Sequence, residues 1–181
     1  MDDDALYAQY LAGDSSAGDR LMLRHGDALT AYLAAFLHNE QDAEDLMLDC
    51  FSVILLNKPK IRAGGFRAYL FKVARNKANR LWRLRFRRQE FQLDESLAAM
   101  EGTPEEDAWK KDRNMLLERC LNRIAPQYRE ALYLIYDQEL TYAQAAEVLG
   151  CGTKRIEDLL RNGKKRLQAE LEKEGVTHAD I

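Results

Sequence analysis

The chain has 181 residues, which is enough for one ordinary domain or two small ones, and 46% of them are apolar. Only 3 Pro and 10 Gly occur, strand-like alternation is nearly absent, and no apolar run is long enough to cross a bilayer, which excludes a β-protein and a membrane-inserted one. The N-terminal residues lack the basic stretch and apolar core of a signal peptide, and we expect a cytoplasmic protein.

The net charge of −3 conceals a strong asymmetry along the chain. Residues 1–50 contain 11 acids and 2 bases, residues 60–88 contain 11 bases and no acid, and residues 89–112 contain 8 acids and 2 bases. Such segregation predicts one surface for a polyanion and another for a basic partner. The acidic isoelectric point is therefore compatible with DNA binding.

The three cysteines, Cys50, Cys120 and Cys151, are far apart and odd in number, which fits neither a disulfide framework nor a metal site. We expect them to be small buried hydrophobic residues. The histidines show no metal-ligand spacing, and the chain has no nucleophile–base pair and no phosphate-binding loop. The sequence therefore predicts no metal, no cofactor and no enzymatic activity.

Apolar residues at helical spacing predict three helices in the first third of the chain. Two lie between Leu6 and Leu37, broken by polar turns near residues 13–18 and at Gly26. The third runs from Asp42 to Asn57, with acids in its first turn, and is ended by Pro59.

Further helices follow in the rest of the chain. A long basic helix is expected from Phe66 to about Phe91, and residues 92–102 form a candidate linker. Thr103 and Pro104 begin a helix that reaches about Ile124, and Pro126 opens another through Tyr136. A helix-turn-helix is predicted over Thr141 to Leu167.

The helix-turn-helix prediction depends on a short helix, a turn at Gly150-Cys151-Gly152 and a second helix from about Lys154 to Lys173. The apolar residues expected to face inward are Ala143, Ala146, Leu149, Ile156, Leu160 and Leu167. The start of the second helix could then enter the major groove and bring basic side chains to DNA. The alternative is a plain helical hairpin or a protein-binding one.

The basic helix combines cations with aromatic residues, namely Phe66, Tyr69, Phe71, Trp82 and Phe86. Cations neutralise phosphates, aromatic faces can stack on unpaired bases, and the amides of Asn76 and Asn79 could bond base edges. The alternative is a solvated charged face above a core stripe. Because no acid accompanies these bases, we favour contact with nucleic acid.

The segment from Asp42 to Asp49 is, from its residues alone, a helix start with acids at the positive end of the helix dipole. It has no His or Ser partner, so paired carboxylates acting as an acid–base device are not expected.

Two parts of the chain resemble one protein family. Asp42-Ala-Glu-Asp-Leu-Met-Leu-Asp-Cys-Phe51 and Phe66-Arg-Ala-Tyr-Leu-Phe-Lys-Val-Ala-Arg-Asn76 resemble domain two of extracytoplasmic-function sigma factors. Ile124-Ala-Pro-Gln-Tyr-Arg-Glu-Ala-Leu132, Leu140-Thr-Tyr-Ala-Gln-Ala-Ala-Glu-Val-Leu-Gly150 and Lys164-Lys-Arg-Leu167 resemble domain four. The resemblance covers nearly the whole chain in the expected order.

The resemblance implies an all-α protein with two small helical domains joined by an acidic linker: residues 1–91, 92–111 and 112–181. It implies a transcription initiation factor that binds core RNA polymerase and recognises and melts promoter DNA. Its implied partners are core polymerase, duplex and melted promoter DNA, and an anti-sigma factor.

The resemblance also implies three groups of site residues. Those expected to bind polymerase are Asp42, Glu44, Asp45, Leu46, Leu48, Asp49 and Ser52. Those expected at the minus-ten element are Lys60, Arg62, Phe66, Arg67, Lys72, Arg75, Asn76, Asn79, Arg80 and Arg83. Those expected at the minus-thirty-five element are Thr141, Tyr142, Thr153, Lys154, Arg155, Glu157, Asp158, Arg161, Lys164 and Lys165.

One stretch departs from the family pattern. Glu157, Asp158 and Leu159 stand where relatives tend to have basic and small polar residues on the exposed face of the recognition helix. The two acids would weaken contacts with phosphates, accept hydrogen bonds from cytosine, or face away from DNA. Two alternatives stay open: a stand-alone helix-turn-helix regulator, and a degenerate sigma-like module that binds polymerase without reading the upstream element.

Overall fold

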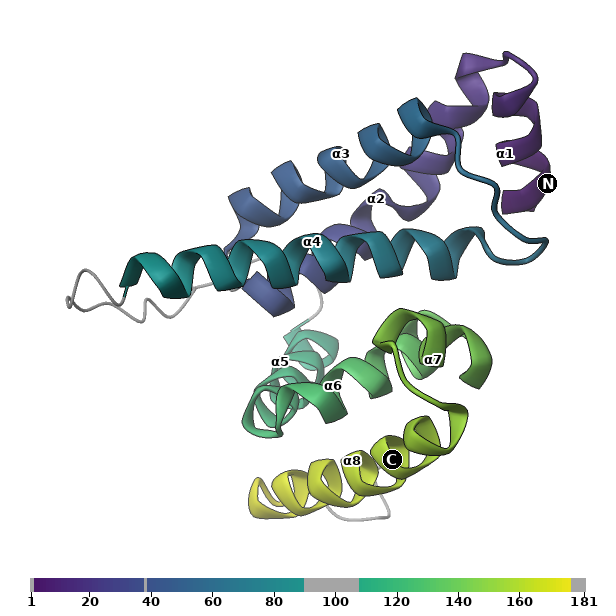
Figure 1. Ribbon diagram of the computed structural model, residues 1–181. Helices are drawn as coiled ribbons and strands as arrows, with labels where there is room; N and C mark the ends of the chain where they lie inside the picture. Colours follow the sequence, from purple (N-terminus) through teal and green to yellow (C-terminus); the bar gives the residue numbers. More distant parts are fainter. Residues whose placement is uncertain (1, 38, 90–107, 177–181) are drawn as a thin grey trace. The chain divides into compact units, whose positions relative to one another are not determined.

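The computed structural model describes residues 2–37, 39–89 and 108–176, with side chains for all of these except 85–89 and 108–114. These ranges form eight α-helices and one π-helical turn, with no strand among them, which confirms the all-α prediction (Figure 1). No helix in the described ranges combines the length and the apolar content needed to cross a membrane.

The helices group into two compact units. The first contains α1 to α4 together with Ala143–Gly150, and the second contains α5, α6, the π-helical turn η1 and α8. Most of the predicted linker, residues 92–111, lies outside the described ranges. The division into residues 1–91, 92–111 and 112–181 therefore stays a prediction.

The first two helices are α1 (Asp3–Leu11) and α2 (Ser15–Leu37). The predicted break at Gly26 is wrong, because α2 continues through both Gly18 and Gly26. A Cβ atom at Gly18 would lie 3.0 Å from the ring of Tyr10. This glycine therefore permits close packing of α2 against α1 and does not mark a turn.

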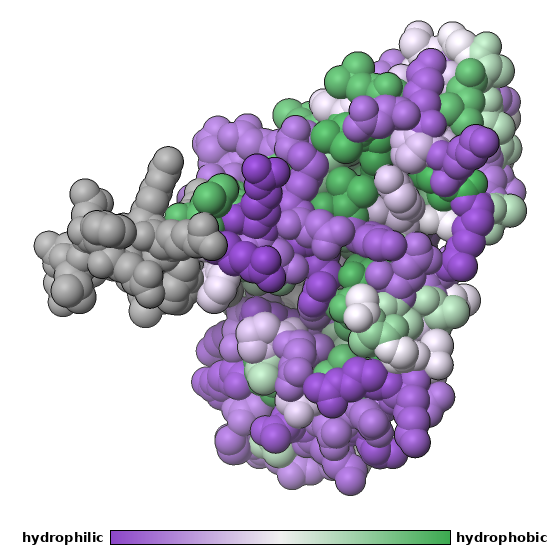
Figure 2. All heavy atoms as spheres, viewed as in Figure 1, coloured by the Kyte–Doolittle hydropathy of each residue, from purple (hydrophilic) through white to green (hydrophobic). Residues whose placement is uncertain are grey.

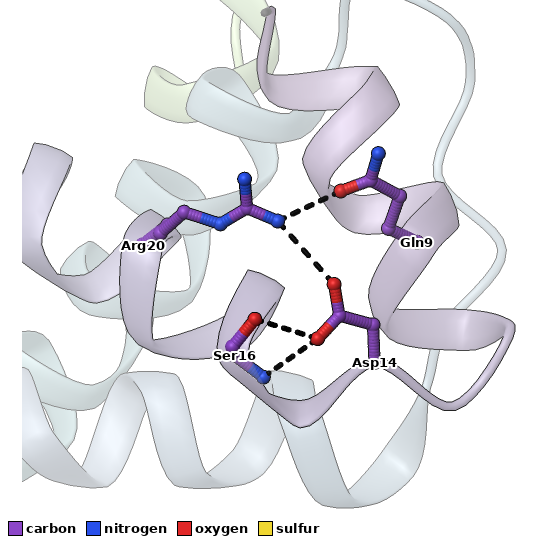
Figure 3. Close-up of polar contacts among 4 residues, drawn as sticks. All are labelled: Gln9, Asp14, Ser16 and Arg20. Atoms are coloured by element: carbon purple, nitrogen blue, oxygen red, sulfur yellow. Dashed lines mark hydrogen bonds and ion pairs between the residues drawn. The ribbon is translucent and has the colours of Figure 1, made fainter.

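A polar cluster joins α1 to α2 at their connecting turn (Figure 3). Asp14 accepts hydrogen bonds from the backbone N–H of Ser16 at 3.0 Å and from its hydroxyl at 2.6 Å. Arg20 donates to Gln9 of α1 at 2.8 Å and approaches Asp14 at 3.3 Å. The cluster thus caps the start of α2 and ties it to α1.

Helix α3 (Glu40–Asn57) begins two residues earlier than predicted because Asn39 caps it, accepting from the backbone N–H of Asp42 at 3.0 Å. The helix ends at Asn57, and the next residue, Lys58, has a left-handed φ of 45° and an N–H that still bonds the carbonyl of Ile54. Pro59 follows, so the predicted end of the helix is confirmed.

Helix α4 (Phe66–Gln89) packs its apolar stripe against α2 and α3. The largest fully buried side chains of this unit are Leu6, Leu21, Leu29, Leu33, Phe51, Ile54, Phe66, Leu70 and Phe71. The rings of Tyr32 and Phe71 meet edge to face with centroids 5.2 Å apart. Cys50 lies inside this core, and burial raises the pKa of its thiol to about 12.

The second unit is built on α5 (Ala108–Arg123), α6 (Pro126–Leu132) and η1 (Tyr133–Asp137), with α8 (Thr153–Lys173) packed against α6. The single helix predicted from Pro126 to Tyr136 instead changes from α to π geometry at Tyr133. Gly163 brings α8 close to α6, since a Cβ atom there would lie 3.3 Å from Tyr128 and Leu132.

The elements predicted for the helix-turn-helix occur in the expected order. Helix α7 (Tyr142–Leu149) is followed by Gly150 with a φ of +66°, and Gly152 caps the first turn of α8. The predicted inward face of α7 is partly wrong, because Ala145, Ala146 and Val148 are buried whereas Ala143 is exposed.

Candidate nucleic-acid interface

The loop of residues 58–65, hereafter the 58–65 loop, leads into the basic helix. Two of its cations, Lys60 and Arg62, are exposed. The loop closes with a turn in which the N–H of Gly65 donates to the carbonyl of Arg62 at 2.9 Å. Gly64 has a φ of +68°, and a Cβ atom at Gly65 would lie 2.8 Å from that carbonyl oxygen, so the turn requires both glycines.

Cations follow the loop along one side of α4. Lys72, Asn76, Arg80 and Arg83 are three or four residues apart and therefore share a helix face. Asn76, Arg80 and Arg83 are exposed, and Lys72 is half-buried. Arg67, Arg75 and Asn79 are also half-buried. The described part of α4 thus presents a basic and amide-bearing face with no acid of its own.

Phe66, predicted to contact DNA, is buried in the structure. Its side chain is 1% exposed, and its ring lies 5.4 Å from that of Tyr7 and 5.9 Å from that of His25, between centroids. Phe71 is buried as well, so these two aromatics belong to the core. Trp82, at 49% exposure beside Arg83, is the aromatic side chain of α4 most open to solvent among those described.

From the sequence, Trp82 is one of several aromatic residues interleaved with the cations and is not predicted to belong to the site. Its position eleven residues after Phe71, three turns along the helix, gives both residues nearly the same helical phase. Periodicity alone therefore predicts a core residue. The end of the packed core before Trp82 is a tertiary feature and leaves the ring exposed.

Helix α3 carries the predicted polymerase surface. Glu44, Asp45, Leu48, Asp49 and Ser52 are exposed at intervals that place them on one face. Asp42 and Leu46 are half-buried at its margin. Figure 2 shows hydrophobic patches over α3. The exposed large hydrophobic residues of this helix are Leu48, at 48% exposure, and Leu56, at 80%.

Leu56 was missed by sequence reasoning, although its helical phase matches that of Ser52 and Leu48. One acid of the face, Asp49, pairs with Lys77 of α4. The face therefore combines acids near the start of α3 with exposed leucines nearer its end. This chemistry suits a protein partner that offers both cations and an apolar contact.

Helix α8 presents a mixed surface. Thr153, Lys154, Arg155, Glu157 and Arg161 are exposed. Arg155 donates to Gln127 of α6 at 3.3 Å, and Asp158 pairs with Arg161 one turn later. Glu157 has no partner among the described residues.

The family pattern places Leu159 on the exposed face of α8, but in the structure it does not lie there. It is 4% exposed and continues the buried stripe of Ile156, Leu160 and Gly163. Leu167, predicted to face inward, is half-buried. The departure from the family pattern therefore reduces to two acids, Glu157 and Asp158.

Two further lysines of α8, Lys164 and Lys165, are exposed. The ammonium of Lys164 lies 4.7 Å from the ring centroid of Tyr136, and a hydrogen bond with Tyr136 raises the pKa of this lysine. Thr141, just before α7, and Tyr142, its first residue, are also exposed. Every described residue predicted for the minus-thirty-five element thus reaches solvent at least in part.

No group of three His, Cys, Asp or Glu side chains in the described ranges could hold a metal ion. Cys50 and Cys120 are buried as predicted, whereas Cys151 is half-exposed beside the α7–α8 turn. The predicted helix cap at Thr103-Pro104 lies outside the described residues.

Two family models match the chain, each on one half of it. The model described as Sigma-70 region 2 matches residues 21–88, which contain α3, the 58–65 loop and nearly all of α4. The model described as Sigma-70, region 4 matches residues 114–167, which contain α6, η1, α7 and the α8 residues predicted for the minus-thirty-five element.

Full-length relatives agree with the models. The chain is 27% identical to the RNA polymerase sigma factor CnrH of Cupriavidus metallidurans, over 94% of each chain. It is 26% identical to the RNA polymerase sigma factor NccH of Alcaligenes xylosoxydans, over 94% of this chain and 95% of that one. Both relatives therefore match from one end of the chain to the other.

The fold matches a solved structure too. CnrH in complex with the cytosolic domain of CnrY aligns with a TM-score of 0.68 and 24% identity, over 94% of this chain and 97% of that one. The sigma factor RpoE of Bartonella quintana, solved in complex with the anti-sigma factor NepR, also aligns with a TM-score of 0.68 and 24% identity. This alignment covers 85% of this chain and 96% of that one.

Proposed function

Because this chain belongs to the extracytoplasmic-function sigma factors of the sigma-70 family, we propose that the surfaces described above are its promoter-binding and polymerase-binding sites. The chain is a transcription initiation factor that binds core RNA polymerase and directs it to promoters. Matches to both regions do not favour a stand-alone helix-turn-helix regulator.

The 58–65 loop and α4 are the proposed site for the minus-ten element. The observation that carries this proposal is the absence of any acid between residues 60 and 88, together with exposed Arg80, Arg83 and Trp82. Cations attract the phosphates of both duplex and single strands, and an exposed indole can stack on an unpaired base. Melting requires both properties on one surface.

The exposed face of α3 is the proposed docking site for core polymerase. The acids Glu44 and Asp45 favour a basic partner, and Leu48 and Leu56 provide apolar contact area that is otherwise open to water. Because α3 packs directly on α4, docking of this face also fixes α4 in the complex.

The exposed residues of α8 are the proposed contacts with the minus-thirty-five element. Thr153 and Lys154 lie in the first turn of the helix, which is the part that enters the major groove in helix-turn-helix proteins. Arg161 and Lys165 follow at four-residue intervals from Glu157 and can reach flanking phosphates.

An anti-sigma factor is the proposed regulator. Two structural neighbours were solved as complexes, one with the cytosolic domain of CnrY and one with the anti-sigma factor NepR. We expect a comparable partner to cover the polymerase-binding face of α3, because exposed Leu56 leaves an apolar patch to be shielded.

Run-off transcription on sheared genomic DNA tests the proposal. Core polymerase is assayed alone, with this protein, and with the variant Arg75→Ala with Arg80→Ala. We expect discrete new transcripts with the protein and their loss with the variant. The matched control is Arg119→Ala with Lys173→Ala, which removes two cations from the second unit outside the proposed sites.

The same assay separates the failures. If the double variant still binds core polymerase but yields no transcripts, the DNA role of α4 is supported. If the wild-type protein binds core polymerase and produces no transcript, the degenerate-module alternative is favoured. If it does not bind core polymerase, the polymerase-binding proposal is wrong.

A further inference from the structure

The 58–65 loop has little internal support. Its backbone contains two residues with left-handed φ, Lys58 at 45° and Gly64 at 68°. Its backbone hydrogen bonds, within it and to the flanking helices, are those from the Lys58 N–H to Ile54, from the Gly65 N–H to Arg62 and from the Tyr69 N–H to Gly65. Helix α7, in the same unit, contacts the far end of this segment: Glu147 pairs with Arg62 at 2.8 Å, and Gln144 donates to the carbonyl of Gly64 at 2.7 Å. Lys60 has no such side-chain contact among the described residues, so its position depends on how the backbone around it is held.

Helix α1 supplies such contacts near both ends of the loop. The Tyr7 hydroxyl donates to the carbonyl of Pro59 at 2.8 Å, and the Asp4 carboxylate accepts from the N–H of Gly64. Tyr7 is 5% exposed and its ring packs on Phe66, the first residue of α4. One side chain of α1 thus contacts both the start of the loop and the helix that follows it.

Helix α1 is itself held at both of its ends. Near its start, Asp3 lies 2.8 Å from Arg24 and 2.9 Å from His25 of α2, between charged or polar atoms. Near its end, Arg20 of α2 donates to Gln9, in the cluster of Figure 3. The helix is therefore a fixed support and not a frayed N-terminal segment.

We propose that α1 is a positioning element for promoter recognition: Tyr7 and Asp4 hold the backbone of the 58–65 loop in the conformation that presents Lys60 and Arg62 to DNA. This inference rests on the proposed function of the loop. It assigns a role in DNA recognition to a helix that carries an excess of acids and has no DNA-binding chemistry of its own. Neither Tyr7 nor Asp4 touches DNA in this proposal.

The test compares Tyr7→Phe with Tyr10→Phe. Both tyrosines lie on α1 and donate one hydrogen bond to a backbone carbonyl, but Tyr10 bonds Leu55 inside α3, at 2.9 Å, and not the loop. Each variant loses one hydroxyl and keeps its ring. Their effects on folding should therefore be similar, and only Tyr7→Phe should affect the loop.

The measured quantity is promoter discrimination by the reconstituted holoenzyme. It is the ratio of transcription rates on a promoter found by run-off and on the same promoter substituted at the upstream edge of its minus-ten element. We expect Tyr7→Phe to lower this ratio about three- to tenfold, the effect of one hydrogen bond, and Tyr10→Phe to leave it unchanged. Affinity for core polymerase and thermal unfolding are measured in parallel.

A purely structural role would not move this ratio, because a less stable factor loses activity on both templates alike. Equal ratios for wild type, Tyr7→Phe and Tyr10→Phe would overturn the inference. An equal fall of the ratio with both variants would overturn it too, because the hydrogen bond from Tyr7 to the loop would then have no more effect on discrimination than the bond from Tyr10 to α3.

A second pair of variants covers the case in which Tyr7→Phe does not fold. Asp4→Ala removes the acceptor for Gly64, whereas Asp4→Asn keeps an oxygen that can accept the same bond. We expect Asp4→Ala to lower the discrimination ratio and Asp4→Asn to restore it. An unchanged ratio with Asp4→Ala would count against the positioning role.

Lys60→Ala with Arg62→Ala shows which idea has failed. If this pair leaves the ratio unchanged, the loop does not read DNA and the proposed function of the loop is wrong. If the pair lowers the ratio while the Tyr7 and Asp4 variants do not, the loop reads DNA without help from α1. Only the positioning inference then falls.

Discussion

The two proposed DNA surfaces differ in how they use charge. The 58–65 loop and α4 carry cations with no acid between residues 60 and 88. On α8 the cations alternate with Glu157 and Asp158, and one of these acids pairs with Arg161 on the same helix. Glu147 pairs with Arg62 and Lys72 of the first surface, at 2.8 and 3.4 Å, but Arg80 and Arg83 share their helix with no acid. The first surface can therefore attract any polyanion, whereas the acids of α8 lie among its proposed DNA contacts and weaken their field.

This difference separates affinity from selectivity. Phosphate contacts provide most of the binding free energy and little sequence information, while contacts with base edges discriminate between sequences. We therefore expect α4 to supply affinity for promoter DNA and α8 to supply selectivity with little affinity. Each of the following experiments tests one part of this contrast.

The largest effect is expected from cations of α4. Arg80→Ala with Arg83→Ala should weaken holoenzyme binding to promoter DNA about 100-fold and lower the salt dependence of binding by a slope of about 2. The measurement is fluorescence anisotropy across a salt series. Lys164→Ala with Lys165→Ala, the matched pair on α8, should cost less, and an equal loss with both pairs would contradict the contrast.

A smaller effect is expected when the packing of α8 against α6 is disturbed. Gly163→Leu should lower the free energy of unfolding by about 2 kcal/mol, because the added side chain would meet Tyr128 and Leu132 of α6, already 3.3 Å from a Cβ atom. Ala169→Leu, at an exposed position of the same helix, is the control. Chemical denaturation compares the two, and equal midpoints would show that α6 accommodates the new side chain.

Removing the acids of α8 should increase affinity. Glu157→Lys with Asp158→Ser is expected to tighten binding to upstream-element DNA about tenfold, because it adds a cation and frees Arg161 from its partner. Holoenzyme binding to short upstream duplexes measures this effect. Glu118→Lys, on the exposed surface of α5, is the control. No gain over this control would indicate that Glu157 and Asp158 face away from DNA.

The smallest effect concerns an acid with a structural role. Burial alone would raise the pKa of Asp3, but contacts with His25 and Arg24 outweigh it and lower this pKa from 3.8 to about 2. A depressed pKa stabilises the fold above pH 3.8, and this contribution is lost as the pH falls toward 2. At pH 6 the free energy of unfolding of the wild type should exceed that of Asp3→Asn by about 1 kcal/mol, after allowance for solvent screening.

Denaturation at pH 6 and at pH 2.5 checks this sign. The difference between wild type and Asp3→Asn should shrink at the lower pH. If the difference in unfolding free energy is the same at both pH values, the charge of the Asp3 carboxylate contributes no stability. Asp3 would then resemble Glu157, an acid without a stabilising partner among the described residues.

Much of this architecture could be predicted from the sequence because helical periodicity repeats over many residues. The end of α3 before Pro59 and the order of α7, turn and α8 are confirmed. Local rules failed where a residue has two physical uses. Gly26 indicated a turn but lies inside a continuous helix.

The candidate site was less predictable for the same reason. Phe66 has the phase of a core residue and the neighbours of a DNA-binding one, and the structure buries it. Leu159 follows two exposed acids, yet the buried stripe of α8 includes it. The hydrogen bond from Tyr7 to Pro59 joins residues far apart in the chain, so no local pattern predicts it.

The buried thiol of Cys50 has a consequence for signalling. Peroxides and electrophiles react with thiolates, and a pKa of about 12 leaves almost none at neutral pH. Because the side chain is also closed to solvent within the helical core, oxidative stress cannot reach the factor through this residue while the first unit stays folded. The Cys50 thiol therefore gives the polymerase-binding helix no reactive cysteine while the core is intact.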